Sequence, residues 1–447
     1  MTVGFYTLGC KVNQYETQAL SFLFQKEGIH TVPLEEHPDV VVLNSCTVTA
    51  ESDRKDRQAL RRLRREHPHA LLILTGCMPQ AFPESAAALS EPDIITGNAG
   101  NDRIIALLRR RMSTGEQVVD IPSHARQISP LVPDGFGERT RAYIKIEDGC
   151  NRFCSYCIIP TARGRVRSKP LEAIEAEARA LAGRGFLEAV LVGINLSAYG
   201  GEGIDLADAV NAAARPSGLR RIRLGSLEPD QLTDDLIERL SHCQKLCPQF
   251  HLSLQSGCDA TLRRMNRHYD TAFYRSLCQT LRERFGGEDG CAITTDVMVG
   301  FPGETQEEFD QSLSFVEEIG LAKVHIFAYS RREGTPAARA QDQICNAEKQ
   351  RRSHIMMEAA DRSARRFLSA QVGRVEEVLL ETGGEDGLAH GFTANYTPVR
   401  ICCKSGMPGQ IEPIRITGVE ENACVGIPAA VENRSAGGPF TANEPIV

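Results

Sequence analysis

Short runs of apolar and β-branched residues alternate with longer amphipathic stretches along most of this chain. Within residues 1–125, helical periodicity occupies 14–27, 50–66, 80–90 and 102–111, and the predicted strands are VGFYTL, DVVVLNS, ALLILTG and DIITG. Strand–helix alternation of this kind is typical of a parallel sheet with helices on both faces. We therefore expect an α/β domain over residues 1–125, with a Pro- and Gly-bearing linker at 121–138.

The alternation resumes beyond this linker with longer helices. Six further strands are predicted, namely AYIKI, EAVLVGI, RIRLGSL, FHLSLQ, AITTDVMVG and VHIFAYS, and a final helix covers roughly 344–370. Six strand–helix units are two fewer than a closed eight-fold barrel contains. The sequence therefore predicts an open (β/α)6 partial TIM barrel over residues 136–370.

The pattern changes again after Gln371. Short alternating strands separated by Gly-rich turns predict a small all-β module over residues 371–431. The tail at 432–447 has little apolar periodicity, and we expect it to be loosely ordered.

Composition narrows the class of protein. The chain of 447 residues is 42% hydrophobic and 24% charged, and it contains no Trp. No signal-peptide pattern precedes the first strand, and the longest apolar runs fall far short of the ~20 residues of a membrane span. We expect a soluble cytoplasmic enzyme with no membrane association. The formal net charge of −7 excludes a protein coated in positive charge, although basic residues can still gather locally.

Fifteen cysteines are better explained in a reducing compartment by metal binding or catalysis than by disulfides. Cys150, Cys154 and Cys157 stand in the stretch DGCNRFCSYCIIP, with the spacing C-x3-C-x2-C, directly after a predicted strand. Three thiolates so close together can hold a cubane iron–sulfur cluster and leave its fourth iron without a protein ligand. The alternative, a closed zinc site, needs four ligands, and no second cysteine pair lies nearby.

Three other cysteines each follow a strand of the first domain. Cys10, Cys46 and Cys77 end the runs FYTLGC, VVVLNSC and LLILTGC, with 35 and 30 residues between them. A lone buried cysteine usually serves only as a small apolar side chain. Because the carboxyl ends of parallel strands share one edge of a sheet, however, these three thiols can converge. As a set, they predict a second cluster.

These motifs resemble those of the radical S-adenosylmethionine (SAM) methylthiotransferases. The resemblance extends over nearly the whole chain and is carried by LGCKVNQYETQA, LNSCTVT, TGCMPQ, GCNRFCSYCIIPTARGRVRS, HLSLQSGCDATLRRMNRHY and TTDVMVGFPGET. It implies an N-terminal methylthiotransferase domain, a radical SAM core and a C-terminal module similar to the TRAM domain. GCKVNQYE and SCTVT are most similar to the branch that acts on tRNA N6-threonylcarbamoyladenosine.

The resemblance also implies two [4Fe–4S] clusters with separate tasks. The Cys150/Cys154/Cys157 cluster would bind SAM and cleave it to a 5′-deoxyadenosyl radical. The radical activates the adenine C2–H at position 37 in the tRNA anticodon loop. The second cluster would hold or donate the sulfur that another SAM methylates. An electron donor such as flavodoxin or ferredoxin is implied.

Two alternative functions remain open at this stage. The same chemistry could act on N6-isopentenyladenosine or on a ribosomal protein. A protein of another class, an iron–sulfur protein that binds RNA or transfers electrons without catalysis, would carry the same ligands.

Five further residues are candidates for the SAM site. Tyr156 lies inside the cysteine motif, and Gly193 and Asn195 follow the second barrel strand, where the resemblance implies contacts to the SAM amino group. Gly300 follows the fifth strand and Gln255 ends the fourth. Ordinary turns and local backbone contacts are the alternative explanations for the last four.

Basic residues immediately follow the cysteine motif. Arg163, Arg165 and Arg167, in RGRVRS, are candidates for RNA phosphate or SAM contacts, and the cationic helix at 53–65 is a weaker candidate. Most such runs are solvated faces. Phosphate contacts would make binding depend on salt, and a protein reaches a base more easily in an unpaired loop.

Overall fold

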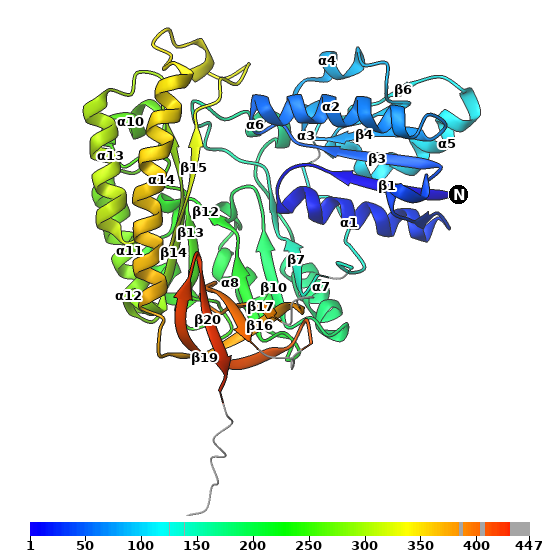
Figure 1. The fold of residues 1–447 in the computed structure, drawn as a ribbon. Coiled ribbons are helices and arrows are strands. Elements are labelled where there is room, and N and C mark those ends of the chain that lie inside the picture. The colour runs from blue at the N-terminus through cyan, green and yellow to red at the C-terminus, as the bar shows by residue number, and fades with distance from the viewer. Residues whose placement is uncertain (125, 138, 384–387, 403–406, 430–447) are drawn as a thin grey trace, which may run out of the picture.

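The computed structural model describes residues 1–124, 126–137, 139–383, 388–402 and 407–429. The tail expected at 432–447 lies outside these residues. Figure 1 shows the N-terminal α/β region beside a larger central sheet with its helices, and a small β-barrel at the far end of that sheet.

The N-terminal region is built on one parallel sheet with the strand order β2-β1-β3-β4-β5-β6. Its strands are β1 (Thr2–Thr7), β2 (His30–Thr31), β3 (Val40–Ser45), β4 (Leu71–Gly76), β5 (Ile94–Ile95) and β6 (Val118–Val119). All six residues of β3 are buried, as a central strand covered on both faces requires. The two-residue strands β2 and β6 are too short to leave a periodic signal, and the sequence did not predict them.

Helices cover both faces of this sheet. They are α1 (Lys11–Lys26), α2 (Ala50–Glu66), α3 (Cys77–Ala81), α4 (Pro83–Ala87) and α5 (Ile104–Thr114). One core contains α1 and α5, and the other contains α2, α3 and α4. The single helix predicted at 80–90 was wrong: the helix ends at Ala81 and α4 starts at Pro83, because proline cannot donate the backbone hydrogen bond of a continuous helix.

The central domain has six parallel strand positions, as predicted. They form two sheets, β7-β10-β11 and β12-β13-β14-β15, and the predicted strand RIRLGSL is divided between them at Gly225. Among the described residues β7 and β15 are edges, so the barrel is open. The strands are β7 (Arg141–Lys145), β10 (Glu188–Val192), β11 (Arg221–Leu224), β12 (Ser226–Leu227), β13 (Gln249–Leu252), β14 (Ala292–Val299) and β15 (Lys323–Ala328).

Longer helices connect these strands and cover their outer side, whereas the short α6 (Ile159–Arg163) lies beside α3 of the N-terminal region (Figure 1). The remaining helices are α7 (Leu171–Gly183), α8 (Leu206–Ala214), α9 (Asp234–Ser241), α10 (Asp259–Arg264), α11 (Thr271–Arg284), α12 (Gly287–Gly290), α13 (Gln306–Ile319) and α14 (Asn346–Ser369). In the part of the chain that the structure describes, none is long and apolar enough to cross a membrane.

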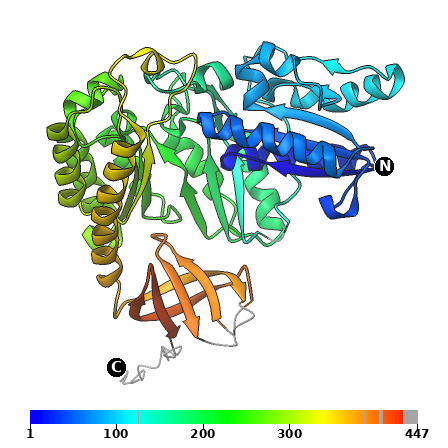
Figure 2. The same ribbon diagram turned by 45° about the horizontal axis from the view of Figure 1, so that its top comes forward.

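The C-terminal module is a closed barrel with the order β16-β17-β18-β20-β19, which confirms the predicted small all-β module. Its strands are β16 (Val375–Gly383), β17 (Leu388–Thr393), β18 (Pro398–Cys402), β19 (Ile411–Glu420) and β20 (Ala423–Pro428). Arg221 and Arg223 at the start of β11 donate to backbone carbonyls of this barrel. The barrel therefore lies at the end of the central sheet where β11 begins (Figure 2).

Candidate metal centres

The loop that carries Cys150, Cys154 and Cys157 is held closed at its base. β8 (Glu147–Asp148) pairs with β9 (Arg167–Ser168), and the Cys150 N–H donates to the Gly164 carbonyl at 3.0 Å. Gly149 has φ +92°, and a Cβ there would lie 2.1 Å from the Arg165 carbonyl oxygen, so only glycine fits this close approach. The two-stranded clamp fixes the cysteine loop beyond the carboxyl end of β7.

The three thiols of this loop lie in a desolvated environment. Burial raises the pKa of Cys150 to about 11 and that of Cys157 to about 12, and the charge of Cys154 adds to both shifts. The guanidinium of Arg267 donates to the Cys154 sulfur at 3.2 Å. Thiols with raised pKa values, as at Cys150 and Cys157, keep their protons until a metal replaces them, which fits a cluster that binds as thiolates form.

Gly193 and Asn195 lie beside this loop, together with a carboxylate that the sequence did not reveal. Glu147 Oε2 accepts the backbone N–H groups of Ile194 and Asn195 at 2.8 and 2.7 Å, and a Cβ on Gly193 would meet it at 2.6 Å. The Asn195 amide approaches the Cys150 sulfur at 4.0 Å. Glu147 Oε1 and Asn195 Oδ1 are buried without a hydrogen-bond partner among the described residues. Two such acceptors fit an amino group of a bound ligand.

The other three candidates for the SAM site occupy separate positions. Tyr156 packs edge-on against Phe301, with 6.4 Å between ring centroids. Gly300 donates its N–H to a carboxylate oxygen of Glu304 at 2.7 Å. Gln255 has the left-handed φ of +68° and exchanges backbone hydrogen bonds with β14. A left-handed non-glycine residue stores strain of a kind found at functional sites.

The strand ends bring the N-terminal cysteines to one edge. Ser45 is paired with Gly76 across β3 and β4, so Cys46 and Cys77 follow at adjacent positions. A Cβ on Gly9 would lie 3.1 Å from the Cβ of Cys46, which shows how closely the Cys10 segment approaches.

Asn13, in the first turn of α1, connects these three segments. Its amide donates to the carbonyls of Leu8 and Ser45 at 2.9 and 2.8 Å. Its Oδ1 lies 3.8 Å from the Cys10 sulfur and 3.9 Å from the Cys77 sulfur. Burial raises the pKa of Cys77 to about 12, although the charge of Arg163 opposes this shift.

The expectation that Arg163 contacts RNA is corrected by the structure. Its side chain is completely buried, so it offers no surface to a phosphate. It points instead into the N-terminal region, where its Nε donates to the Cys77 sulfur at 3.2 Å. Arg163 stands next to the cluster loop in sequence, and the positive run around it gave no sign of this burial.

The two neighbouring arginines differ from Arg163 and from each other. Arg167 is largely buried and pairs with Asp148 at 3.1 Å. Arg165 is exposed, and its guanidinium lies 5.1 Å from the centroid of the Phe153 ring. Phe153 is 49% exposed inside the cluster loop and has φ +52°. On the helix at 53–65, Lys55, Arg57 and Arg65 are exposed.

The two groups of cysteines lie on segments that pack together. Cys77 and Ala81 of α3 form an apolar cluster with Ile158 and Ala162, and Figure 1 shows α3 beside α6. Asn98 strengthens the contact, because its amide donates to the Ala162 carbonyl at 2.8 Å. The segment after Cys157 thus rests on the segment after Cys77.

Within the described residues, no three His, Cys, Asp or Glu side chains are arranged around the position of a single metal ion. In a four-iron cluster the cysteine ligands surround a larger group, since each binds a different iron. Thiols that hold a cluster are therefore spaced more widely than thiols that hold a single ion.

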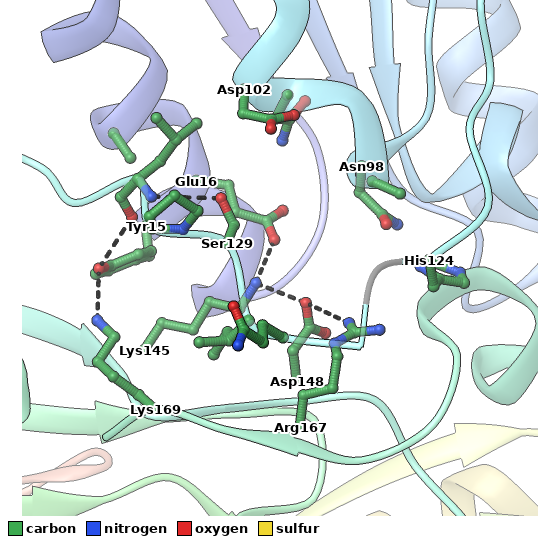
Figure 3. Close-up of a pocket in the computed structure, with 17 residues that line it drawn as sticks. Tyr15, Glu16, Asn98, Asp102, His124, Ser129, Lys145, Asp148, Arg167 and Lys169 are labelled. Atoms are coloured by element: carbon green, nitrogen blue, oxygen red, sulfur yellow. Dashed lines mark hydrogen bonds and ion pairs between the residues drawn. The ribbon is translucent and has the colours of Figure 1, made fainter. Parts of the chain in front are cut away.

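A cavity of about 180 Å³ lies next to this junction. Tyr15 and Glu16 line it from α1, Lys145 and Asp148 from the central domain, and residues 127–131 from the connecting segment. Figure 3 shows the Lys145 ammonium between the carboxylates of Glu16 and Asp148. The connecting segment therefore borders a network of charges at this cavity, although its Leu131 also packs against the apolar core of the N-terminal region.

Comparisons with known proteins identify the family. Residues 144–316 match the model of the radical SAM superfamily, and residues 2–97 match the uncharacterized protein family UPF0004. The threonylcarbamoyladenosine tRNA methylthiotransferase MtaB of Bacillus subtilis is 36% identical, over 93% of each chain. The tRNA-2-methylthio-N(6)-dimethylallyladenosine synthase of Symbiobacterium thermophilum is 34% identical, over 92% of this chain and 91% of the relative. The chain belongs to the radical SAM methylthiotransferase family.

Solved structures agree with this fold. The radical SAM methyltransferase TsrM of Kitasatospora setae superimposes with a TM-score of 0.57 at 16% identity, over 75% of this chain and 76% of that one. This likeness concerns the fold. That the chain is a methylthiotransferase enzyme rests on its relatives, and the radical SAM match implies SAM and a [4Fe–4S] cluster. The non-catalytic alternative is set aside.

Proposed function

We propose that this methylthiotransferase transfers a methylthio group to C2 of N6-threonylcarbamoyladenosine at position 37 of tRNA. In this proposal residues 1–125 form the sulfur-donating domain, 136–370 the radical SAM core and 371–431 a TRAM-like module. The enzyme acts in the cytoplasm on the anticodon loop and takes electrons from a donor such as flavodoxin or ferredoxin.

Two [4Fe–4S] clusters serve this reaction. Cys150, Cys154 and Cys157 would hold one, and Cys10, Cys46 and Cys77 the other. When bound, the clusters supply the electron that cleaves SAM and the sulfur that is transferred. The observation that carries the two-cluster proposal is the packing of the Cys77 segment against the Ile158 segment, which brings a sulfur source close to the site of radical formation.

Residues of this chain prepare the site for SAM. The free oxygens of Glu147 and Asn195 would accept hydrogen bonds from the SAM amino group, and Tyr156, Gln255 and Gly300 would border the rest of the cofactor. Burial raises the pKa of Glu147 to about 8, while the backbone N–H of Asn195 opposes this shift. An incoming ammonium group would favour the ionised carboxylate.

One observation favours threonylcarbamoyladenosine over the isopentenyl substrate. Lys11, the residue after Cys10, is an exposed cation at the start of α1, beside the proposed N-terminal cluster. The threonylcarbamoyl group carries a carboxylate that this ammonium could bind, whereas the isopentenyl group is an uncharged hydrocarbon. Sequence identity does not separate the substrates, since relatives named for each are similarly identical.

The exposed pair of Phe153 and Arg165 is the proposed RNA contact of the cluster loop. An aromatic ring can stack on an unpaired base, and an arginine can bind phosphate or stack as well. Phe153 lies between Cys150 and Cys154, and Arg165 follows the last cysteine of the loop. A base stacked on this pair would therefore lie next to the radical.

Mass spectrometry of tRNA nucleosides tests the substrate. A deletion strain should lose 2-methylthio-threonylcarbamoyladenosine and regain it when the wild-type gene is restored. A deletion strain that expresses the Lys11→Gln variant should contain about a tenth or less of the wild-type level of 2-methylthio-threonylcarbamoyladenosine. The reason is that a hydrogen bond to a charged group contributes about 1.5–3 kcal/mol. A deletion that instead removes the methylthio group from isopentenyladenosine or from a ribosomal protein would select the alternative substrate.

A further inference from the structure

We propose that Arg163 is a positioning residue for the N-terminal cluster: it fixes the Cys77 ligand and supplies the positive charge that this centre needs. This inference rests on the proposed function, because it assumes that Cys10, Cys46 and Cys77 hold a cluster. Arg163 belongs to the radical SAM core, so one domain would complete the metal site of the other.

The hydrogen bonds of the Arg163 guanidinium are made to the N-terminal region, although Nη1 also lies 3.7 Å from Asp148 Oδ2 of its own domain. Nε donates to the Cys77 sulfur at 3.2 Å, and Nη1 donates to Glu16 Oε1 at 2.5 Å. Nη2 donates to Asn13 Oδ1 at 2.8 Å and to Glu16 Oε2 at 3.0 Å. Because Asn13 also contacts the segments of Cys10 and Cys46, a single arginine reaches the supports of all three cysteines.

The backbone of Arg163 is as constrained as its side chain. Residue 163 ends α6, and the carbonyl of the next residue, Gly164, accepts the Cys150 N–H at 3.0 Å. Arg167 also donates to the Arg163 carbonyl at 3.0 Å. The guanidinium is therefore anchored to the loop of one cysteine group while it contacts the other.

Arg163 lies in a network of buried charges. Arg163 and Lys145 pair with Glu16, Lys145 and Arg167 pair with Asp148, and Arg163 also approaches Asp148 at 3.7 Å. These five side chains are almost completely buried. An uncompensated buried charge is costly, and the guanidinium that contacts Cys77 can be neutralised there by a thiolate or by an anionic cluster.

A hydrogen bond and a positive charge at a ligand sulfur have a measurable consequence. Reduction adds an electron to a cluster, and a nearby cation stabilises the more negative state, so it raises the reduction potential. Partners that orient metal ligands also typically contribute about 10–100-fold to metal affinity. Removing Arg163 should lower both the potential and the retention of iron.

Arg332 offers a matched control for the contact between the domains. It also projects from the radical SAM core into the N-terminal region, where it pairs with Asp53 at 2.5 Å and donates to the Thr47 hydroxyl. It is 3% exposed, and no contact between it and a cysteine sulfur is recorded among the described residues. Arg332→Gln thus weakens domain docking next to Cys46, at Thr47, without removing a hydrogen bond to a ligand sulfur.

The test uses the full chain with Cys150→Ala, Cys154→Ala and Cys157→Ala, in which the N-terminal centre is the one cluster proposed to remain. Arg163→Gln, Arg163→Lys and Arg332→Gln are added separately to this parent. Spectroelectrochemical titration followed by electron paramagnetic resonance gives the midpoint potential, and the rate of iron loss to a chelator gives retention. Circular dichroism confirms that each variant is folded.

Arg163→Gln should move the potential to a more negative value and lose iron about tenfold faster. Arg163→Lys keeps the charge, so its midpoint potential and its rate of iron loss should lie between those of Arg163→Gln and the parent. If Arg163→Gln does not fold, Arg163→Lys is compared with the parent instead. Arg332→Gln should match the parent. Parent-like values in the Arg163 variants, or equal changes in Arg163→Gln and Arg332→Gln, would overturn the inference alone. A parent that binds no iron would overturn the second cluster and the inference with it.

Discussion

The two sets of three cysteines in this enzyme share one feature but are assembled in different ways. In each, a buried arginine donates to one cysteine sulfur at 3.2 Å: Arg267 to Cys154, and Arg163 to Cys77. The first group lies on one short loop clamped by β8 and β9, whereas the second comes from three separate strand ends. The loop site needs only its own domain, while the strand-end site also needs an arginine from the neighbouring domain.

The charges at the two sites also differ. Around Arg267, two arginines face two carboxylates, since Arg152 pairs with Glu228 and Asp230 and Arg267 pairs with Glu228. Around Arg163, Lys145 shares Glu16, the carboxylate to which this arginine donates. Under the two-cluster proposal, an anionic centre at Cys77 would be a further partner for the Arg163 guanidinium.

Replacing each cysteine triad should separate the two tasks most strongly. A variant with Cys150→Ala, Cys154→Ala and Cys157→Ala should produce no 5′-deoxyadenosine from SAM, because no open iron remains to bind it. A variant with Cys10→Ala, Cys46→Ala and Cys77→Ala should still produce 5′-deoxyadenosine but should transfer no methylthio group. Chromatography of both products under reducing, anaerobic conditions measures this. Equal loss of SAM cleavage in two folded variants would contradict the division of labour.

Glu16→Gln should be the next largest effect, this time on stability. It removes the carboxylate that binds both Arg163 and Lys145, and breaking a buried ion pair costs about 3–5 kcal/mol. Glu228→Gln should cost less, since burial raises the pKa of Glu228, whereas Arg163 and Lys145 hold the pKa of Glu16 below its usual value despite burial. Thermal unfolding measures both, with Glu27→Gln as a control, because Glu27 pairs with the exposed Arg109 and such pairs contribute about 0–1 kcal/mol. A Glu16→Gln variant as stable as the control would show that the buried ion pairs of Glu16 do not stabilise the fold.

Phe153→Ala tests whether the exposed ring in the cluster loop contacts tRNA. Stacking of a base on an aromatic ring contributes about 1–3 kcal/mol, so the affinity for tRNA should fall by about 5- to 100-fold without loss of SAM cleavage. Phe273→Ala is the matched control, since Phe273 is 40% exposed on α11. A filter-binding assay that gives both variants the same affinity would remove Phe153 from the interface.

The smallest effect is expected for Arg165→Ala. Loss of one phosphate contact should weaken tRNA binding several-fold and reduce the slope of log K against log salt by about one. Arg179→Ala provides the comparison, because Arg179 is an exposed residue that pairs with Glu175 on α7. An unchanged slope in Arg165→Ala would assign Arg165 to the solvated surface.

Local patterns were enough to predict most of the fold. The apolar runs located the main strands, and α2 covers 50–66 as expected because its periodicity and its capping Thr49 are both local. Pro83 offered a visible signal for the break between α3 and α4, which the helical periodicity concealed. The closed C-terminal barrel also followed from alternation and turns.

The surroundings of the cysteines could be predicted only in part. Strand-end positions predicted that Cys10, Cys46 and Cys77 would share an edge, since parallel strands end together. The burial of Arg163 depends on Glu16 and Asn13, which lie in another domain, and a basic run gives no indication of such partners. Glu147 and Arg267 were missed for the same reason: their roles arise from contacts between distant segments.

The central claim is that six thiols form two separate cluster sites. Anaerobic measurement of iron and acid-labile sulfide per chain tests it most directly, in the wild type and in both triple-alanine variants. The account predicts the content of two cubanes in the wild type and of one in each variant. A wild type that holds a single cubane, lost entirely when Cys150, Cys154 and Cys157 are replaced and untouched when Cys10, Cys46 and Cys77 are replaced, would contradict it.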